Sequence, residues 1–132
     1  QIAYRLKRTR SLKYYHILCL VMERLVQAGK VFGSYIRYQD FGAMRASPDD
    51  ASGIVEELAS LSGAEMVVLL RELNPDTVHG SIRSKSTDSA LNTARAFGGG
   101  GHGMAAGFTR KGRADELIDQ VIEEGMKWVN KA

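Results

Sequence analysis

The sequence has 132 residues, 44% of them hydrophobic and 25% charged, and its formal net charge is +3. This length and composition are ordinary for one soluble globular domain, and so mild a positive charge does not by itself indicate a nucleic-acid-binding protein. The one cysteine, Cys19, excludes an internal disulfide, and neither a signal peptide nor an apolar run of the ~20 residues that span a membrane is visible, so we expect a cytoplasmic protein without a membrane partner.

The first segment predicts a long helix. No proline or glycine interrupts Tyr4 to Ala28, and Gly29 is a suitable C-terminal stop. Because the chain opens on Gln1 and not on Met, we expect it to be part of a longer protein. We therefore assign residues 1–28 to a linker helix that leads from a missing upstream domain.

The two halves of this expected helix differ in chemistry. Residues 5–13 are rich in Arg and Lys, which suits either a solvated linker or an arm that contacts phosphates. Residues 14–22 are apolar on every side except at His16. Such a helix either lies wholly inside the domain core or also docks on something else, such as an upstream domain or a second copy of the chain. We expect docking, and a homodimer is one form of it.

The middle of the chain alternates strand and helix patterns. β-Branched and aromatic residues predict a strand over 30–38. Ser47-Pro48-Asp49-Asp50 is typical of a helix N-terminus, and apolar residues three and four apart continue that helix to Gly63. The unbroken apolar run of 64–73 predicts a strand that is covered on both faces.

A turn at Asn74-Pro75-Asp76 leads into a second strand over 77–84, which we expect to pair with the preceding strand as a hairpin. Its two faces differ, because side chains alternate along a strand. One face carries Val78, Gly80, Ile82 and Ser84, and the other carries Thr77, His79, Ser81 and Arg83.

The last third of the chain predicts three more elements. Thr87 or Asp88 caps a short helix that ends near Phe97, AAGFT forms a strand, and residues 113–130 form a closing amphipathic helix. The whole pattern predicts an α/β fold, with a small mixed sheet flanked by helices and preceded by the linker helix.

The stretch RAFGGGGHGMAAGF, residues 95–108, places six glycines around His102. One glycine would suffice to end the preceding helix. Successive glycines permit positive φ and let a ligand approach the backbone, so that several N–H groups converge on an anion. His102 would add a donor or a cation, and a short helix beginning after it would direct further N–H groups at the same anion. We expect a phosphate-binding loop, and the alternative is a merely flexible one.

SIRSK at 81–85, followed by RAFGGGGH and then AAGF, resembles the C-terminal DHH-associated domain of DHH-family phosphoesterases. The likeness is greatest to the oligoribonucleases that also dephosphorylate phosphoadenosine phosphate. It is strong over residues 81–108 and extends in pattern from 30 to 130. The related domain of alanyl-tRNA synthetases is also glycine-rich, but the Gly-Gly-Gly-His ending favours the phosphoesterases.

This resemblance implies which residues hold a nucleotide. In the family, the arginine and serines of the SIRS strand and the Gly-Gly-Gly-His loop bind the substrate. The matching residues here are Ser81, Arg83, Ser84, Gly99, Gly100, Gly101 and His102. Arg83 offers a planar fork for a phosphate, although it could instead be a structural ion-pair partner. His79 either lines the same site or is simply half-exposed.

The resemblance also implies where hydrolysis takes place. The family's metals, usually manganese, are held by an N-terminal domain with an Asp-His-His signature, and this triplet does not occur here. The three histidines, His16, His79 and His102, have no metal-ligand spacing. We therefore expect no catalytic residue, metal ligand or cofactor in this chain, with Mn²⁺ in the missing DHH domain.

Two functions of different classes fit these expectations. In the first, residues 29–132 are the substrate-binding domain of a metal-dependent phosphoesterase that hydrolyses short RNA or DNA, dinucleotides or phosphoadenosine phosphate. In the second, the same loop belongs to a non-catalytic module that senses a nucleotide. A role in tRNA handling is a third alternative. An Asp-His-His domain upstream would favour the first.

Overall fold

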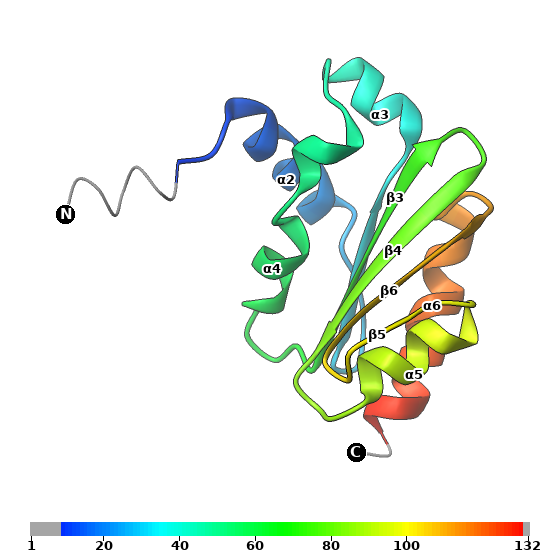
Figure 1. Ribbon diagram of the computed structural model, residues 1–132. Coiled ribbons are helices and arrows are strands. Elements are labelled where there is room, and N and C mark those ends of the chain that lie inside the picture. Colours follow the sequence, from blue (N-terminus) through cyan, green and yellow to red (C-terminus); the bar gives the residue numbers. More distant parts are fainter. Residues whose placement is uncertain (1–8, 131–132) are drawn as a thin grey trace.

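The apolar runs of the sequence meet in a six-stranded sheet that lies between two layers of helices (Figure 1). The computed structural model describes residues 9–130. The strand order is β1-β2-β3-β4-β6-β5, and only β2 and β3 run parallel, so the sheet is mixed as expected. The elements in chain order are α2 (Leu12–Glu23), β1 (Val26–Ala28), β2 (Val31–Ile36), α3 (Tyr38–Ala43), the 3₁₀ helix η1 (Pro48–Ala51), α4 (Ile54–Ala59), β3 (Met66–Asn74), β4 (Thr77–Ser84), α5 (Ser89–Ala96), β5 (Gly100–Gly101), β6 (Ala105–Lys111) and α6 (Ala114–Val129).

The hairpin expected around Asn74-Pro75-Asp76 is confirmed. The side-chain Oδ1 of Asn74 accepts a hydrogen bond of 3.1 Å from the Asp76 N–H, which is the local bond that makes Asn a turn residue. β3 and β4 pair antiparallel on either side of it, with Leu69 opposite Ser81 and Arg71 opposite His79. This register decides which side chains of the two strands lie next to one another.

The two faces of the sheet are covered by different helices (Figure 1). α5 and α6 cover one face, and their apolar residues pack on Val68, Leu70, Val78, Ile82 and Phe108. α2, α3 and α4 lie on the other face, where the sheet contributes Phe32, Ile36, Val67 and Leu69. The central strand β3 supplies both cores, which explains its continuous apolar run.

The second layer of helices does not cover the whole sheet. Its core takes sheet residues from β2 and β3, whereas on β4 the side chains of the same face are only half-buried. These are Thr77, His79, Ser81 and Arg83, whereas Val78, Gly80, Ile82 and Ser84 are buried on the opposite face, as the alternation predicted. A strip of sheet formed by β4, β6 and β5 therefore stays open beside α4.

The long N-terminal helix is confirmed as a helix but is shorter than expected. α2 begins only at Leu12, with Ser11 as its N-cap, so residues 9–11 are not helical as expected. It ends at Glu23, and Val26–Ala28 forms the edge strand β1, so the expectation of a helix to Ala28 is also wrong. Pairing with β2 and packing of Val26 on the α6 side of the sheet override the local helix pattern. Residues 4–8 of the expected helix lie outside the described residues.

α2 is buried on one side and exposed on the other. Tyr14, Ile17 and Val21 are buried in the second core, whereas Tyr15 and Met22 are 48% and 40% exposed. The alternative of a helix wholly inside the core is therefore wrong for the described turns. Docking of the exposed side stays a prediction. No helix within residues 9–130 combines the length and the apolar character that a membrane crossing requires.

The helix expected from Ser47 to Gly63 is divided in two. Pro48–Ala51 is a 3₁₀ turn with Ser47 as its N-cap residue and a capping box between Ser47 and Asp50, and α4 begins at Ile54. Gly53 separates them with a φ of +96°, which a helix cannot contain. The break places η1 and α4 as two short walls beside the open strip of sheet.

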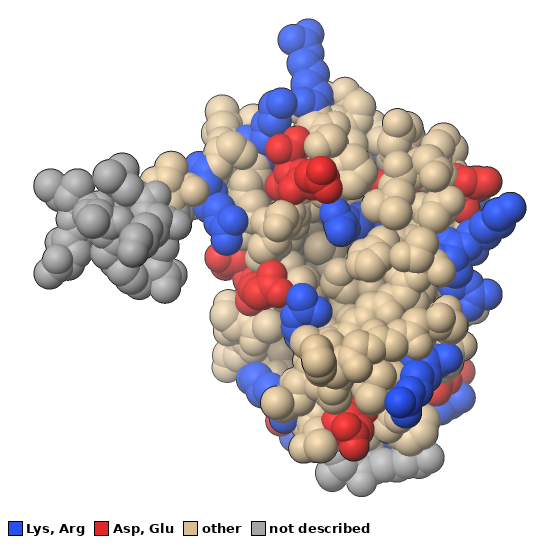
Figure 2. Space-filling view, in the orientation of Figure 1, with Lys and Arg blue, Asp and Glu red and all other residues tan. Residues whose placement is uncertain are grey.

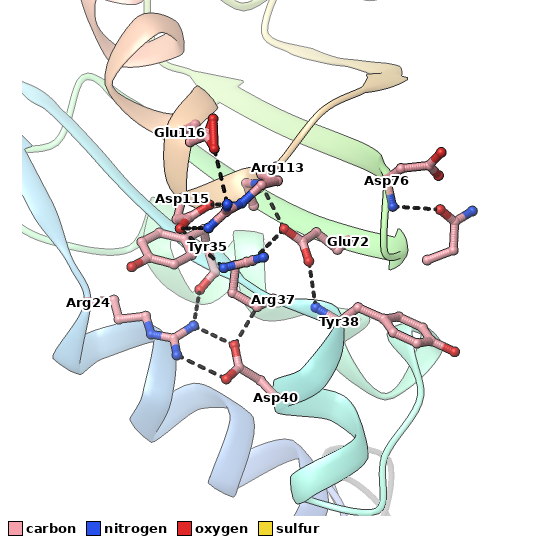
Figure 3. Close-up of polar contacts among 12 residues, drawn as sticks. Arg24, Tyr35, Arg37, Tyr38, Asp40, Glu72, Asp76, Arg113, Asp115 and Glu116 are labelled. Atoms are coloured by element: carbon pink, nitrogen blue, oxygen red, sulfur yellow. Dashed lines mark hydrogen bonds and ion pairs between the residues drawn. The ribbon is translucent and has the colours of Figure 1, made fainter.

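The buried carboxylate of Glu72, near the end of β3, connects β3 to the N-termini of α3 and α6 (Figure 3). The Glu72 side chain is 1% exposed and accepts hydrogen bonds from Arg37 Nε at 2.6 Å, the Tyr38 N–H at 2.7 Å and the Ala114 N–H at 2.9 Å. It thus neutralises Arg37 and caps the N-termini of α3 and α6. The sequence pattern does not reveal this role, because Glu72 lies within an apolar run that predicts only a buried strand.

Candidate functional site

The open strip of sheet brings four of the seven expected site residues into one hollow. Opposite residues of antiparallel strands point to the same face, and the register aligns Ser81 of β4 with Gly107 of β6 and Gly107 with Gly100 of β5. The hollow has a volume of about 400 Å³. It is lined by His79, Ser81 and Arg83 from β4, Gly100 and Gly101 from β5, and residues 105–107 from β6.

The glycine run forms an edge strand and not a free loop. Gly100 and Gly101 pair with Gly107 and Ala106, and β5 has β6 as its single neighbour in the described sheet. The peptide groups on its outer side are therefore left for other partners. No helix starts directly after His102, so the further N–H groups that such a helix would supply are not present. The chain instead turns back at once, with the His102 N–H donating to the Ala105 carbonyl at 2.8 Å.

Two glycines of the run are required by packing, and one is not. A Cβ on Gly99 would lie 2.1 Å from the Gly107 carbonyl oxygen, and one on Gly101 would lie 2.7 Å from the Ala106 Cα. A Cβ on Gly100 would meet nothing within 4 Å. The fold therefore explains the absence of a side chain at Gly99 and Gly101, whereas at Gly100 it leaves open space above the sheet, where a ligand could approach the backbone.

Arg83 is the cation of the hollow, and it is paired with a carboxylate. Its Nη2 lies 2.9 Å and its Nε 3.1 Å from Oε2 of Glu56 on α4, and its Nη1 donates to the Ile82 carbonyl at 3.0 Å. The ion pair that the sequence left open as an alternative is thus present. Because Glu56 is 58% exposed, this is a solvated pair of small net stability, and an incoming phosphate can compete for the guanidinium.

Ser84 does not reach the hollow. It is buried on the other face of β4, where its hydroxyl donates to the Ser86 carbonyl at 2.9 Å and accepts from the Ala90 N–H at 3.0 Å. It replaces the missing side-chain cap of α5, since the N-cap residue Asp88 makes no such bond. The Ser84 N–H also donates to the Met104 carbonyl at 3.0 Å, so this residue holds the turn after His102 in place.

His79 lines the hollow, one of the two alternatives left open by the sequence. Its Nδ1 lies 3.0 Å from the hydroxyl of Thr109 on β6. Burial lowers the pKa of His79 below its ordinary 6.5, and the positive charge of Arg71 lowers it further. His79 is therefore a neutral ring at pH 7, which offers a hydrogen bond or a flat surface to a ligand but no charge.

His102 lies at the end of the glycine strand and is exposed. Its ring has no hydrogen bond or ion pair with any residue of the described chain, so it is available to a ligand at the edge of β5. The ring is not part of the wall of the hollow itself. Gly99 also lies outside this wall, because it packs under β6.

The arrangement suits the binding of a phosphorylated ligand. Small residues make the floor, so backbone groups are accessible. Hydroxyl and guanidinium donors come from one strand, and Figure 2 shows Lys or Arg side chains bordering the hollowed middle of this face, with Asp or Glu side chains beside some of them. Over residues 9–130, no three His, Cys, Asp or Glu side chains are grouped as a metal site. The small-residue floor and the donors of Ser81 and Arg83 are chemically suited to an anion.

Part of this wall is not evident from the sequence. Ala105 and Gly107 line the hollow, yet in the sequence they belong only to a short strand after the glycines. The signal that could have found them is the run of small residues in Ala105-Ala106-Gly107, which is unusual on a strand that must bury one face.

Comparison with known proteins agrees with the motifs. Residues 29–131 match the DHHA1 domain. The chain is 40% identical, over 86 residues, to the bifunctional oligoribonuclease and PAP phosphatase NrnA of Thermus thermophilus, an alignment that covers 64% of this chain and 25% of that protein. The chain thus spans about a quarter of this relative's length.

Solved structures share the fold. An exopolyphosphatase-related protein from Bacteroides fragilis superimposes with a TM-score of 0.78 at 20% identity, over 91% of this chain and 36% of its own. RecJ from Thermus thermophilus, solved in complex with Mg²⁺, superimposes with a TM-score of 0.53 at 18% identity, over 98% of this chain and 19% of its own. The domain match covers most of the chain and confirms the resemblance carried by SIRSK and GGGGH, so the chain belongs to the DHHA1 family, the domain associated with DHH phosphoesterases.

Proposed function

We propose that this chain is the nucleotide-binding domain of a DHH-family phosphoesterase and holds one end of a short RNA, DNA or dinucleotide, or a phosphoadenosine phosphate, in the hollow on β4, β6 and β5. The observation that carries this proposal is the row Ser81–Gly107–Gly100, with Arg83 beside it, on the face of β4, β6 and β5 that the described helices leave open. The NrnA relative, which bears the name of an oligoribonuclease and PAP phosphatase, supports the same class of ligand.

Each side chain has a definite part in this proposal. Arg83 neutralises a phosphate and gives it two parallel donors once Glu56 is displaced. Ser81 donates a short hydrogen bond from the floor, and Gly100 lets the ligand rest on the backbone of β5. The exposed His102 ring contacts the ligand at the outer edge, and the neutral His79 ring contacts its uncharged part.

The chain binds and orients the ligand but does not cleave it. An upstream Asp-His-His domain would hold the metal ions, of which manganese is the first candidate, and these ions would supply the chemistry of hydrolysis. By holding the ligand against that domain, this chain contributes proximity and orientation. The sheet, together with the hydrogen bonds of buried Glu72 to Arg37 and Ala114, supplies a rigid support for holding the ligand.

Nuclear magnetic resonance of the ¹⁵N-labelled chain tests the proposal. Addition of adenosine 3′,5′-bisphosphate should shift the amide resonances of Ser81, Arg83, Gly100, Gly101 and Gly107 and leave those of α6 unchanged. Shifts confined to the α5–α6 side, or none at millimolar ligand, would overturn it. Addition of Mn²⁺ should give no phosphate release from this chain alone, because the described residues form no metal site.

A further inference from the structure

A second, smaller hollow continues from the first. It has a volume of about 170 Å³ and shares Ser81 and Arg83 with the larger hollow. Its other walls come from the end of η1, the start of α4 and the segment between them, and from Leu69 and Arg71 of β3. This space is large enough for several waters, and therefore for a phosphate group.

Arg71 is the arginine of this second hollow that does not line the first. The register places it opposite His79, on the same face of the sheet as Ser81 and Arg83. One nitrogen, Nη1, donates to the Pro48 carbonyl at 2.7 Å, which fixes the side chain against η1. The remaining donors of the guanidinium have no hydrogen bond or ion pair with any residue in the range that the structure describes.

This charge is unusual for its position. Arg71 is half-buried, and partly buried charges are normally paired, as Arg24 is with Asp40 and Arg37 with Glu72. Glu56 is the one acidic residue in the wall of the second hollow, and its carboxylate is already bound to Arg83.

We propose that the second hollow is an anion subsite in which Arg71, together with Arg83 at the junction of the two hollows, binds a second phosphate of the ligand. This inference rests on the proposed function, because the first phosphate and the nucleoside occupy the larger hollow. It assigns a binding role to a β3 residue that lies outside both the SIRS strand and the glycine run. A ligand with two phosphates on one nucleoside, or with a terminal and an internucleotide phosphate, fills both hollows.

Isothermal titration calorimetry with two probes that differ by one phosphate tests the subsite. The 132-residue chain should bind adenosine 3′,5′-bisphosphate about tenfold more tightly than adenosine 5′-monophosphate, the ratio expected for one charge-assisted contact. Arg71→Gln should reduce this ratio to about twofold or less while leaving the affinity for the monophosphate nearly unchanged. Arg71→Lys, which keeps the charge, should retain most of the ratio and shows that the effect is electrostatic.

The matched control is Arg110→Gln, since Arg110 is an exposed arginine that lies over the Phe97 ring and not in either hollow. It should change neither affinity, and the thermal unfolding of each variant confirms that the fold is intact. An equal loss for both probes in Arg71→Gln, or no loss for either, overturns the subsite while the larger hollow stands. If neither probe binds to the unmodified chain, the proposed function fails, and the subsite fails with it.

Discussion

Arg83 of β4 and Glu56 of α4 form an ion pair across the open edge of the site, with Nη2 and Oε2 2.9 Å apart. The pair connects β4, which carries the side chains proposed to bind the ligand, to the helix α4 beside the hollow. A carboxylate in this position competes with any phosphate for the same guanidinium. The first prediction concerns that competition.

Glu56→Gln should increase the affinity for adenosine 5′-monophosphate about threefold to tenfold, because it removes a negative charge close to the bound phosphate. The loss in unfolding free energy should stay below about 1 kcal/mol, as for exposed ion pairs. Glu57→Gln is the matched control, since Glu57 is the next residue on the same helix and makes no ion pair within residues 9–130. A lower affinity in Glu56→Gln would mean instead that Glu56 is needed to orient Arg83.

Two adjacent glycines should respond to alanine in opposite ways. Gly99→Ala should lower the unfolding free energy by about 2 kcal/mol, because its Cβ meets the Gly107 carbonyl and the Phe108 Cβ. Gly100→Ala should change stability by less than about 0.5 kcal/mol, since its Cβ enters open space, yet it should weaken nucleotide binding. Urea unfolding and calorimetry measure the two effects. Full affinity in Gly100→Ala would show that no ligand approaches β5 at this point.

The His79 ring should titrate below pH 6.5, as followed by its ring proton resonances. The folded state then binds fewer protons at His79 than the unfolded state does, so the stabilisation present above pH 6.5 is lost as the pH falls toward the lower pKa of the folded state. His79→Gln should remove this part of the pH dependence of unfolding. Arg71→Gln should raise the pKa of His79 only in part, because burial is the larger cause. An unchanged slope in His79→Gln contradicts the assignment.

Glu72→Gln should lower the unfolding free energy by about 3 kcal/mol, the range for breaking a buried ion pair. The Gln amide carries no charge and cannot neutralise Arg37. Its NH₂ group is a donor, so it would face N–H donors that in the native protein bond to a carboxylate oxygen. Glu123→Gln on the exposed side of α6 is the control and should change stability by less than about 0.5 kcal/mol. A loss below about 1 kcal/mol in Glu72→Gln would show that the ionised Glu72 carboxylate is not needed to hold β3, α3 and α6 together.

The local sequence pattern predicts a helix or strand correctly where the tertiary contacts of the segment favour the same structure. The alternation over 77–84 determines the two faces of β4, and the turn chemistry of Asn74 determines the hairpin. At the N-terminus the helix pattern runs on to Ala28, but strand pairing with β2 decides the structure of Val26–Ala28. The spacing of apolar residues likewise does not predict the break between η1 and α4, because this break depends on the positive φ of Gly53.

The candidate site shows the same division between local and long-range information. Sequence motifs alone identified the family, through SIRSK and the glycines before His102, and named Ser81, Arg83, Gly100 and Gly101, which line one hollow. Packing and register established that Ser84 caps α5, that Glu56 holds Arg83, and that Arg71 lines the adjoining hollow. Glu56 and Arg83, for example, are 27 positions apart in the sequence and meet only because α4 packs beside β4. Local residue spacing does not predict such contacts, because they depend on strand register and helix packing, which the whole sheet determines.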